Sequence, residues 1–144
     1  MYNNAGAQTY KALWQSCNTV KKCDIWNQPP VVKDLEHKAT VYQYLEKLQG
    51  TFIPRLKMAL MSNGLEVVLV TDFRGHIISQ ECLKDSDKET IRGALSAIHR
   101  LRVLHRDIRS QNILVERNGS TKRFVIINFG RSELTANKRK LQQE

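Results

Sequence analysis

The chain has 144 residues, of which 41% are hydrophobic and 26% are charged, as in ordinary soluble globular proteins. The formal net charge of +9 suits a phosphate-rich partner, but no aromatic side chains are interleaved with the basic ones, which argues against nucleic acid. No run reaches the roughly 18 apolar residues of a membrane-spanning helix. Three cysteines without metal-ligand spacing are typical of free thiols in a reducing compartment, so we expect a cytoplasmic protein without a membrane segment.

The first half of the chain predicts a small sheet with one helix. A break at Pro29-Pro30 precedes the helix, and Gly50 is expected to end it. The helix shows an apolar stripe at helical spacing, and the last strand is rich in β-branched residues. In chain order we expect strands at 10–14 and 17–25, a helix at 34–49, a weak pattern at 54–60 and a strand at 65–71.

The second half predicts one longer helix and a hairpin. A capping box at residues 86–89 opens the helix, and Asn118-Gly119 is a turn signal between two strands. The tail from Glu133 to Glu144 is expected to form one helix. In chain order we expect a helix from 86 to about 102, a polar loop at 105–111 and strands at 113–115 and 124–127.

The polar loop carries the most informative motif. His105-Arg106-Asp107 is followed by Asn112, between the predicted helix and a strand, and Asn128-Phe129-Gly130 comes after the next strand. This ordered set resembles the catalytic loop and the metal-binding loop of protein kinases. The resemblance implies an α+β fold in two small lobes. Residues 1–72 would form a small-lobe-like part, a small sheet with one helix and no evident first strand. Residues 73–144 would form an abbreviated, mostly helical large-lobe-like part with the catalytic loop.

The resemblance also implies roles for individual residues. Asp107 would be the general base, Asn112 a magnesium ligand, and Arg109 would neutralise charge on the transferred phosphoryl group. Asn128 would lie at the position of the carboxylate that binds metal, and His105 is expected to pack rather than to react.

The nucleotide would be held by the first part of the chain. Lys21 resembles the lysine that anchors the phosphates, and Lys38 lies at the helix position that donates a glutamate to that lysine. Asp72 and Phe73 resemble the hinge that binds adenine. The run from Leu48 to Pro54 looks like that of compact kinase-like proteins multiplied in some fungal genomes.

Two of these positions depart from the kinase pattern. Lys38 replaces the glutamate and falls on the apolar stripe of the helix, so it either points inward or extends to solvent. Asp34 shares that face but lies a full turn away, and Lys21 would then meet a second cation. Asn128 replaces the aspartate, and an amide is a much poorer ligand for Mg²⁺ than a carboxylate.

We therefore expect a pseudokinase or a very weak kinase that binds ATP and acts through an unidentified protein partner, with a degraded Mg²⁺ site. Lys21 and Lys38 together would neutralise a triphosphate without metal. One alternative is an active Ser/Thr-type kinase with unusual metal usage, because Asp107 and Asn112 remain. The other is a basic nucleic-acid-binding protein that retains the fold.

Overall fold

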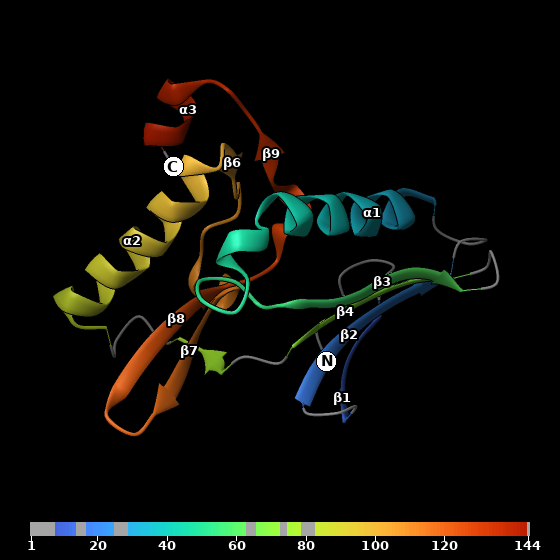
Figure 1. The fold of residues 1–144 in the computed structure, drawn as a ribbon, viewed down its shortest axis with the longest axis horizontal. Helices are drawn as coiled ribbons and strands as arrows, with labels where there is room; N and C mark the ends of the chain where they lie inside the picture. Colours follow the sequence, from blue (N-terminus) through green and yellow to red (C-terminus); the bar gives the residue numbers. More distant parts are fainter. Residues whose placement is uncertain are drawn as a thin grey trace.

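The computed structural model describes residues 8–13, 17–24, 29–62, 66–72, 75–78 and 83–143. The first of its two parts is a four-stranded antiparallel sheet with strand order β1-β2-β4-β3, and helix α1 lies across one face of it (Figure 1). The elements are β1 (Gln8–Leu13), β2 (Cys17–Asp24), α1 (Pro29–Tyr44), β3 (Leu56–Ser62) and β4 (Glu66–Asp72). The packing is apolar: Val32 and Leu35 of α1 form one buried cluster with Leu69 of β4.

In the described residues, the second part combines two helices with two small antiparallel sheets of order β5-β7-β8 and β6-β9, so strands contribute to it as well as helices (Figure 1). Its elements are β5 (His76–Ile77), α2 (Asp85–Arg100), β6 (Val103–Leu104), β7 (Ile113–Asn118), β8 (Thr121–Ile126), β9 (Glu133–Leu134) and α3 (Lys138–Gln143). The described residues also include the 3-10 turns η1 (Glu46–Leu48), η3 (Ser110–Asn112) and η4 (Phe129–Arg131). The predicted α+β class is confirmed. None of the helices among the described residues has the length and apolar character needed to cross a membrane.

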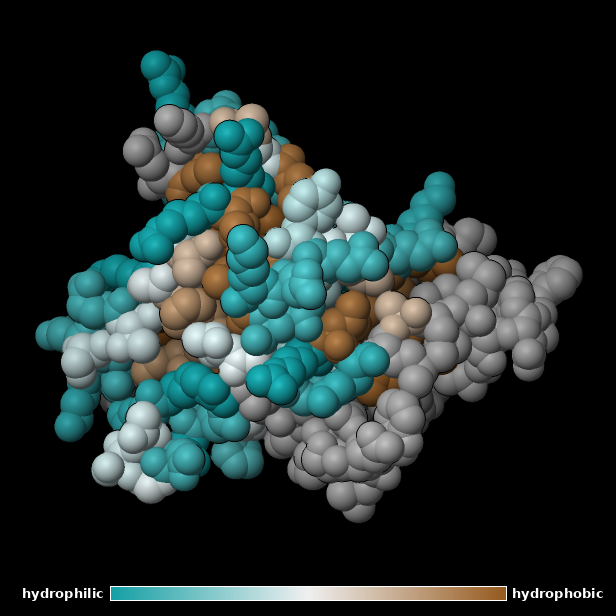
Figure 2. All heavy atoms as spheres, viewed as in Figure 1, coloured by the Kyte–Doolittle hydropathy of each residue, from teal (hydrophilic) through white to brown (hydrophobic). Residues whose placement is uncertain are grey.

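One hydrophobic core joins the two parts. Its members come from α1 and the segment after it, from α2, and from the strands and turn around the predicted motif: Val41, Tyr42, Leu45, Ile53, Ala94, Ile98, Val103, Ile126 and Phe129. Figure 2 shows hydrophobic residues gathered along the middle of the visible face, with hydrophilic residues around them. Because the core is shared, the position of α1 is coupled to the position of the loops in the second part.

Several predicted boundaries were wrong, each for a local reason. Helix α1 begins at Pro29 and ends at Tyr44. Proline is tolerated at its start because it lacks only an amide hydrogen that the first helical turn would leave unpaired. Gly50 lies beyond the helix, in a turn where its positive φ of 79° is required. The tail is not one helix: β9 pairs with β6 before α3 begins.

The amino terminus of α2 also differs from the prediction. The residue that caps it is Lys84, whose backbone amide donates to Asp87 Oδ2 at 3.1 Å. A hydrogen bond from Lys122 of β8, at 3.0 Å, and the Lys84 amide lower the pKa of Asp87. The carboxylate therefore serves the helix terminus and the neighbouring sheet together.

We predict that Gly75→Ala destabilises the fold more than Gly119→Ala. Both glycines have φ near +60°, where an alanine costs about 1–2 kcal/mol. A Cβ at Gly75 would also lie 2.1 Å from the backbone oxygen of Val115, whereas at Gly119 it would meet nothing within 4 Å. Urea denaturation should give an excess loss of about 1–3 kcal/mol for Gly75→Ala, as in other overpacked sites. Equal losses for the two variants would show that the approach to Val115 is relaxed.

Candidate active site

The predicted loops meet around the ring of Phe129, which has no exposed surface. Tyr42 of α1 packs edge-on against it with a centroid distance of 5.6 Å, and His105 does so from the other loop at 4.8 Å. His105 is also fully buried, and its Nε2 donates to the carbonyl of Ile127 at 2.8 Å. Burial, together with the negative charge of Asp72, raises the pKa of Tyr42, so this phenol stays neutral. The edge-on contacts of Tyr42 and His105 with Phe129 therefore fix α1, the histidine loop and the Asn128-Phe129-Gly130 loop relative to one another.

A chain of side-chain hydrogen bonds connects the three polar residues of the motif. The amide nitrogen of Asn112 donates to both the carboxylate and the backbone oxygen of Asp107, each at 2.8 Å. The amide nitrogen of Asn128 donates in turn to Oδ1 of Asn112 at 3.2 Å. Asn128 adopts the left-handed conformation (φ 71°, ψ 59°), which asparagine tolerates better than most residues. The structure thus brings Asp107, Asn112 and Asn128 together as the spacing predicted.

Arginines lie on both sides of Asp107 and belong to different contacts. The guanidinium of Arg109 lies 3.2 Å from the carboxylate of Asp107 and is more than half exposed. Arg106 lies 3.4 Å from Glu133 of β9, and Lys140 of α3 donates to the same glutamate at 2.9 Å. The hydrogen bond from Lys140 is the main reason why the pKa of Glu133 is lowered. Arg109 is therefore the cation beside the predicted base, and much of its side chain faces solvent.

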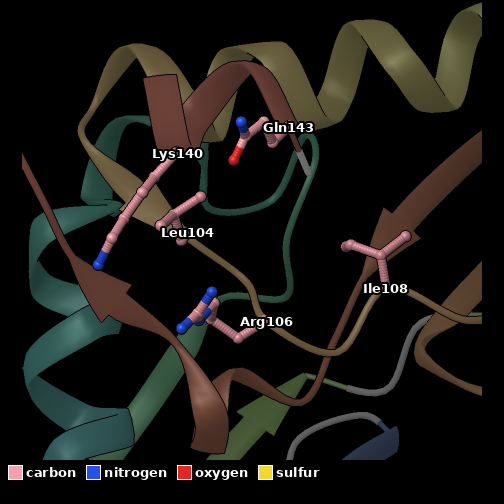
Figure 3. A pocket seen from close by; sticks show the side chains of 5 residues that line it. All are labelled: Leu104, Arg106, Ile108, Lys140 and Gln143. Atoms are coloured by element: carbon pink, nitrogen blue, oxygen red, sulfur yellow. The ribbon is translucent and has the colours of Figure 1, made fainter. Parts of the chain in front are cut away.

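A cavity of about 380 Å³ lies beside this loop (Figure 3). Its lining comes from the histidine loop and α3: Leu104, Arg106, Ile108, Lys140 and Gln143. None of the predicted catalytic or metal-binding residues lines it, although Arg106 and Ile108 are the chain neighbours of Asp107.

Helix α1 presents a buried cation to the loop. The side chain of Lys38 is 7% exposed and forms an ion pair with Asp34, one turn earlier on the same helix. A Cβ on Gly130 would lie 2.5 Å from Cε of Lys38 and 2.7 Å from Oδ1 of Asp34, so the pair packs directly against that glycine. Lys38 points inward, one of the two directions that its place on the helical stripe left open, and its charge is balanced by Asp34.

Two contacts made by residues of α1 were not predicted. The sequence put Asp34 on the face of Lys38 but did not pair the two, although residues four apart on a helix are neighbours and their spacing was the available signal. The second is the bond of His37, whose Nε2 donates to the carbonyl of Ser132 at 2.8 Å. No local pattern announces that bond, because 95 residues separate the two partners.

The structure tests the predictions about nucleotide binding less than those about the catalytic loop. Lys21 lies on β2 opposite Leu69 of β4, but its side chain is outside the described residues, as is Phe73. Asp72 ends β4, and its carboxylate accepts the backbone amide of Arg55 at 2.6 Å. Its own amide donates to the carbonyl of Arg55 at 3.0 Å. Asp72 therefore joins the ends of two strands, while its contribution to adenine binding stays a prediction.

The side chains around Asn112 do not fit a magnesium ion well. Among the residues that the structure describes, no three acidic, histidine or cysteine side chains gather where they could hold a metal. The oxygen that Asn112 would offer already accepts a hydrogen bond from Asn128. Mg²⁺ prefers carboxylates and water in octahedral geometry, and Asp107 alone supplies a carboxylate here.

Sequence comparison identifies the family of the chain. A family model described as the protein kinase domain matches residues 9–144. The chain belongs to the protein kinase family. Misshapen-like kinase 1 of Rattus norvegicus is 32% identical over 75 residues, which cover 52% of this chain and 5% of that protein. The putative ribosomal protein S6 kinase alpha-2 of Caenorhabditis elegans is 30% identical over 112 residues, which cover 71% of this chain and 14% of that protein.

These matches confirm the predicted protein-kinase-like family, whose members in general bind ATP with Mg²⁺. The chain spans a small fraction of the length of both relatives. The predicted division at residues 72 and 73 stays a prediction.

We predict that Asp34→Asn destabilises the fold because it leaves the buried ammonium of Lys38 without a carboxylate. Urea denaturation should show a loss of about 2–3 kcal/mol, somewhat below the range for fully buried pairs since Asp34 is partly exposed. Lys38→Met should cost less, because the remaining carboxylate reaches solvent. The double variant should recover part of the Asp34→Asn loss.

The control for these two single variants and their double variant is Glu89→Gln, which breaks the ion pair with Arg92 on the exposed face of α2. It should change stability by at most about 0.5 kcal/mol. If Asp34→Asn were as mild as this control, the ammonium of Lys38 would have another way to be solvated.

Proposed function

We propose that this chain is a pseudokinase, which binds an adenine nucleotide, transfers phosphate very poorly and acts through a protein partner. The observation that carries the proposal is the hydrogen bond from Asn128 to Asn112. In an active kinase both positions direct oxygen atoms at the metal ions that bridge the phosphates. Here Asn128 supplies an amide nitrogen instead, and this nitrogen is directed at the side-chain oxygen of Asn112.

The expected catalytic defect follows from electrostatics. Phosphoryl transfer depends on positioning and on neutralising charge that develops on the phosphoryl oxygens. Losing one preorganised stabiliser of this kind commonly costs on the order of 10²–10³ in rate. Lys38 adds a second defect, because the helix position that resembles the lysine's glutamate partner holds a cation paired with Asp34.

Nucleotide binding is supported by the family and by charge. The net charge of +9 favours a phosphate-rich ligand, and Lys21 is the proposed contact to the phosphates. Asp72 and Phe73 are the proposed hinge beside the adenine. Lys38 remains a candidate for the same phosphates only if a ligand draws it away from Asp34.

One observation favours the alternative of an active kinase with unusual metal usage. The carboxylate of Asp107 accepts from Asn112 and faces Arg109, and its side chain is only 12% exposed. This arrangement suits a general base that receives the proton of a substrate hydroxyl. The base is therefore held in place even though the metal-binding side is altered.

The decisive experiment measures nucleotide binding and phosphate transfer separately. We predict that ATP at about 100 times its dissociation constant raises the free energy of unfolding by roughly 2.7 kcal/mol, seen as a higher thermal midpoint. Transfer of labelled γ-phosphate to a generic basic protein substrate should be no faster than with Asp107→Asn. The asparagine keeps the shape of Asp107 and can still accept from Asn112.

The two outcomes separate the candidates. Transfer that exceeds the Asp107→Asn level, with Mg²⁺ or Mn²⁺, would establish the active kinase instead. A thermal midpoint unchanged by ATP would remove nucleotide binding from the proposal and leave partner binding as its content.

A further inference from the structure

We infer that the side-chain amide of Asn128 takes the place of the divalent cation in this site, so that the loops are held, and any nucleotide is bound, without metal. The inference deepens the proposed function at the same site. It rests on the hydrogen bonds among Asp107, Asn112 and Asn128 rather than on any nucleotide contact.

The bonding of Asn112 is the first step. This residue is 4% exposed, and its side chain offers one NH₂ group and one oxygen. The NH₂ group donates to Asp107, and the oxygen accepts from Asn128. A metal ion could use only the second lone pair of that oxygen, and the NH₂ group of Asn128 would stand beside it where the kinase pattern has a carboxylate.

The backbone supports the same arrangement. The amide of Ile127 donates to the carbonyl of Asn112 at 2.9 Å, which joins the two loops next to Asn128. Phe129 on the other side is anchored in the core. Asn128 is therefore held between two fixed neighbours, in a left-handed conformation that aims its side chain at Asn112.

The charge of the site is the third step. A cation in this position would normally neutralise two carboxylates and the phosphates. With an amide at 128, Asp107 is the only carboxylate in the chain of hydrogen bonds, and Arg109 already lies beside it. The site balances its own charge, so a divalent cation has no excess negative charge to neutralise until a ligand brings its own.

Replacing Asn128 by aspartate should reverse this balance. A carboxylate cannot donate to Oδ1 of Asn112, and it brings a second negative charge next to the residue that holds Asp107. The expected result is a lower thermal midpoint in chelator and a midpoint restored by millimolar Mg²⁺, because an ion that binds only the folded state stabilises it. The unchanged protein should have the same midpoint with Mg²⁺ and with chelator.

Two further variants make the comparison specific. Asn118→Asp makes the same chemical change in the exposed β7–β8 turn, and its midpoint should not respond to Mg²⁺. Asn128→Gly tolerates the left-handed backbone and removes the donor without adding charge, so its midpoint should fall and stay low in Mg²⁺. A response to Mg²⁺ in Asn118→Asp would mean that the effect of Asn128→Asp is general charge screening, which overturns the inference.

A measurement on the unchanged protein keeps the inference testable if Asn128→Asp fails to fold. In ¹⁵N NMR spectra, added Mn²⁺ should leave the side-chain amide signals of Asn112 and Asn128 sharp. Selective broadening of these two signals would place a metal ion in the site and overturn the inference. So would an Asn128→Asp variant that folds but ignores Mg²⁺.

The nucleotide measurement separates this inference from the proposed function. The thermal shift that ATP causes in the unchanged protein should be equal in Mg²⁺ and in chelator, and should require Mg²⁺ in Asn128→Asp. A shift in the unchanged protein that appears only with Mg²⁺ would overturn the inference while supporting nucleotide binding. No shift in either condition would overturn nucleotide binding, and the metal measurements without nucleotide would still decide the role of Asn128.

Discussion

The burial of one aromatic ring determines how the rest of this molecule is arranged. Phe129 is fully enclosed by a core that α1, α2 and two strands contribute to. Burying such a ring is worth about 1.5–3 kcal/mol, and each edge-on contact with Tyr42 or His105 adds roughly 0.5–1.5 kcal/mol. Close-packed protein cores do not deform gradually. The packing around Phe129 therefore positions both α1 and the histidine loop. The geometry of the candidate site is thus a consequence of core packing.

Because the ring is fixed, each of its two chain neighbours is held against a different partner. Asn128 is directed at Asn112, and Gly130 lies against the pair formed by Lys38 and Asp34. Both departures from the kinase pattern are therefore compensated locally: the lysine by a carboxylate one turn away, and the asparagine by an acceptor in the facing loop. Buried polar groups are costly when unpaired, so each substitution is tolerable only with its partner. The two substitutions lie on either side of Phe129 and belong to one site.

The sequence predicted the parts of this site that depend on spacing. The loop around Asp107 and Asn112 and the strand order of the hairpin follow from motif spacing. Helical periodicity put Lys38 on the apolar stripe but left open whether it points inward or extends to solvent, and the structure buries it. The hydrogen bond of Asn128 does not, because it requires a left-handed backbone that only the surrounding loops impose. The bond between His37 and Ser132 joins distant residues and has no local signature. Helix ends were misjudged where proline and lysine occupied positions that usually carry other residues.

The amide of Asn128 and the ammonium of Lys38 are both paired within the protein, which fits the proposed pseudokinase better than a site built to stabilise a transient charge. Catalytic stabilisation needs donors and cations that are directed at the reacting atoms before the reaction begins. Here Asn128 is directed at Asn112, and Lys38 at Asp34, so both satisfy neighbours in the protein. Tyr42, Lys38 and His37 join α1 to the loop. The position of α1 can therefore respond to a movement of the loop. A ligand that shifted the loop would therefore shift the helix, and a helix is a surface that a protein partner can recognise.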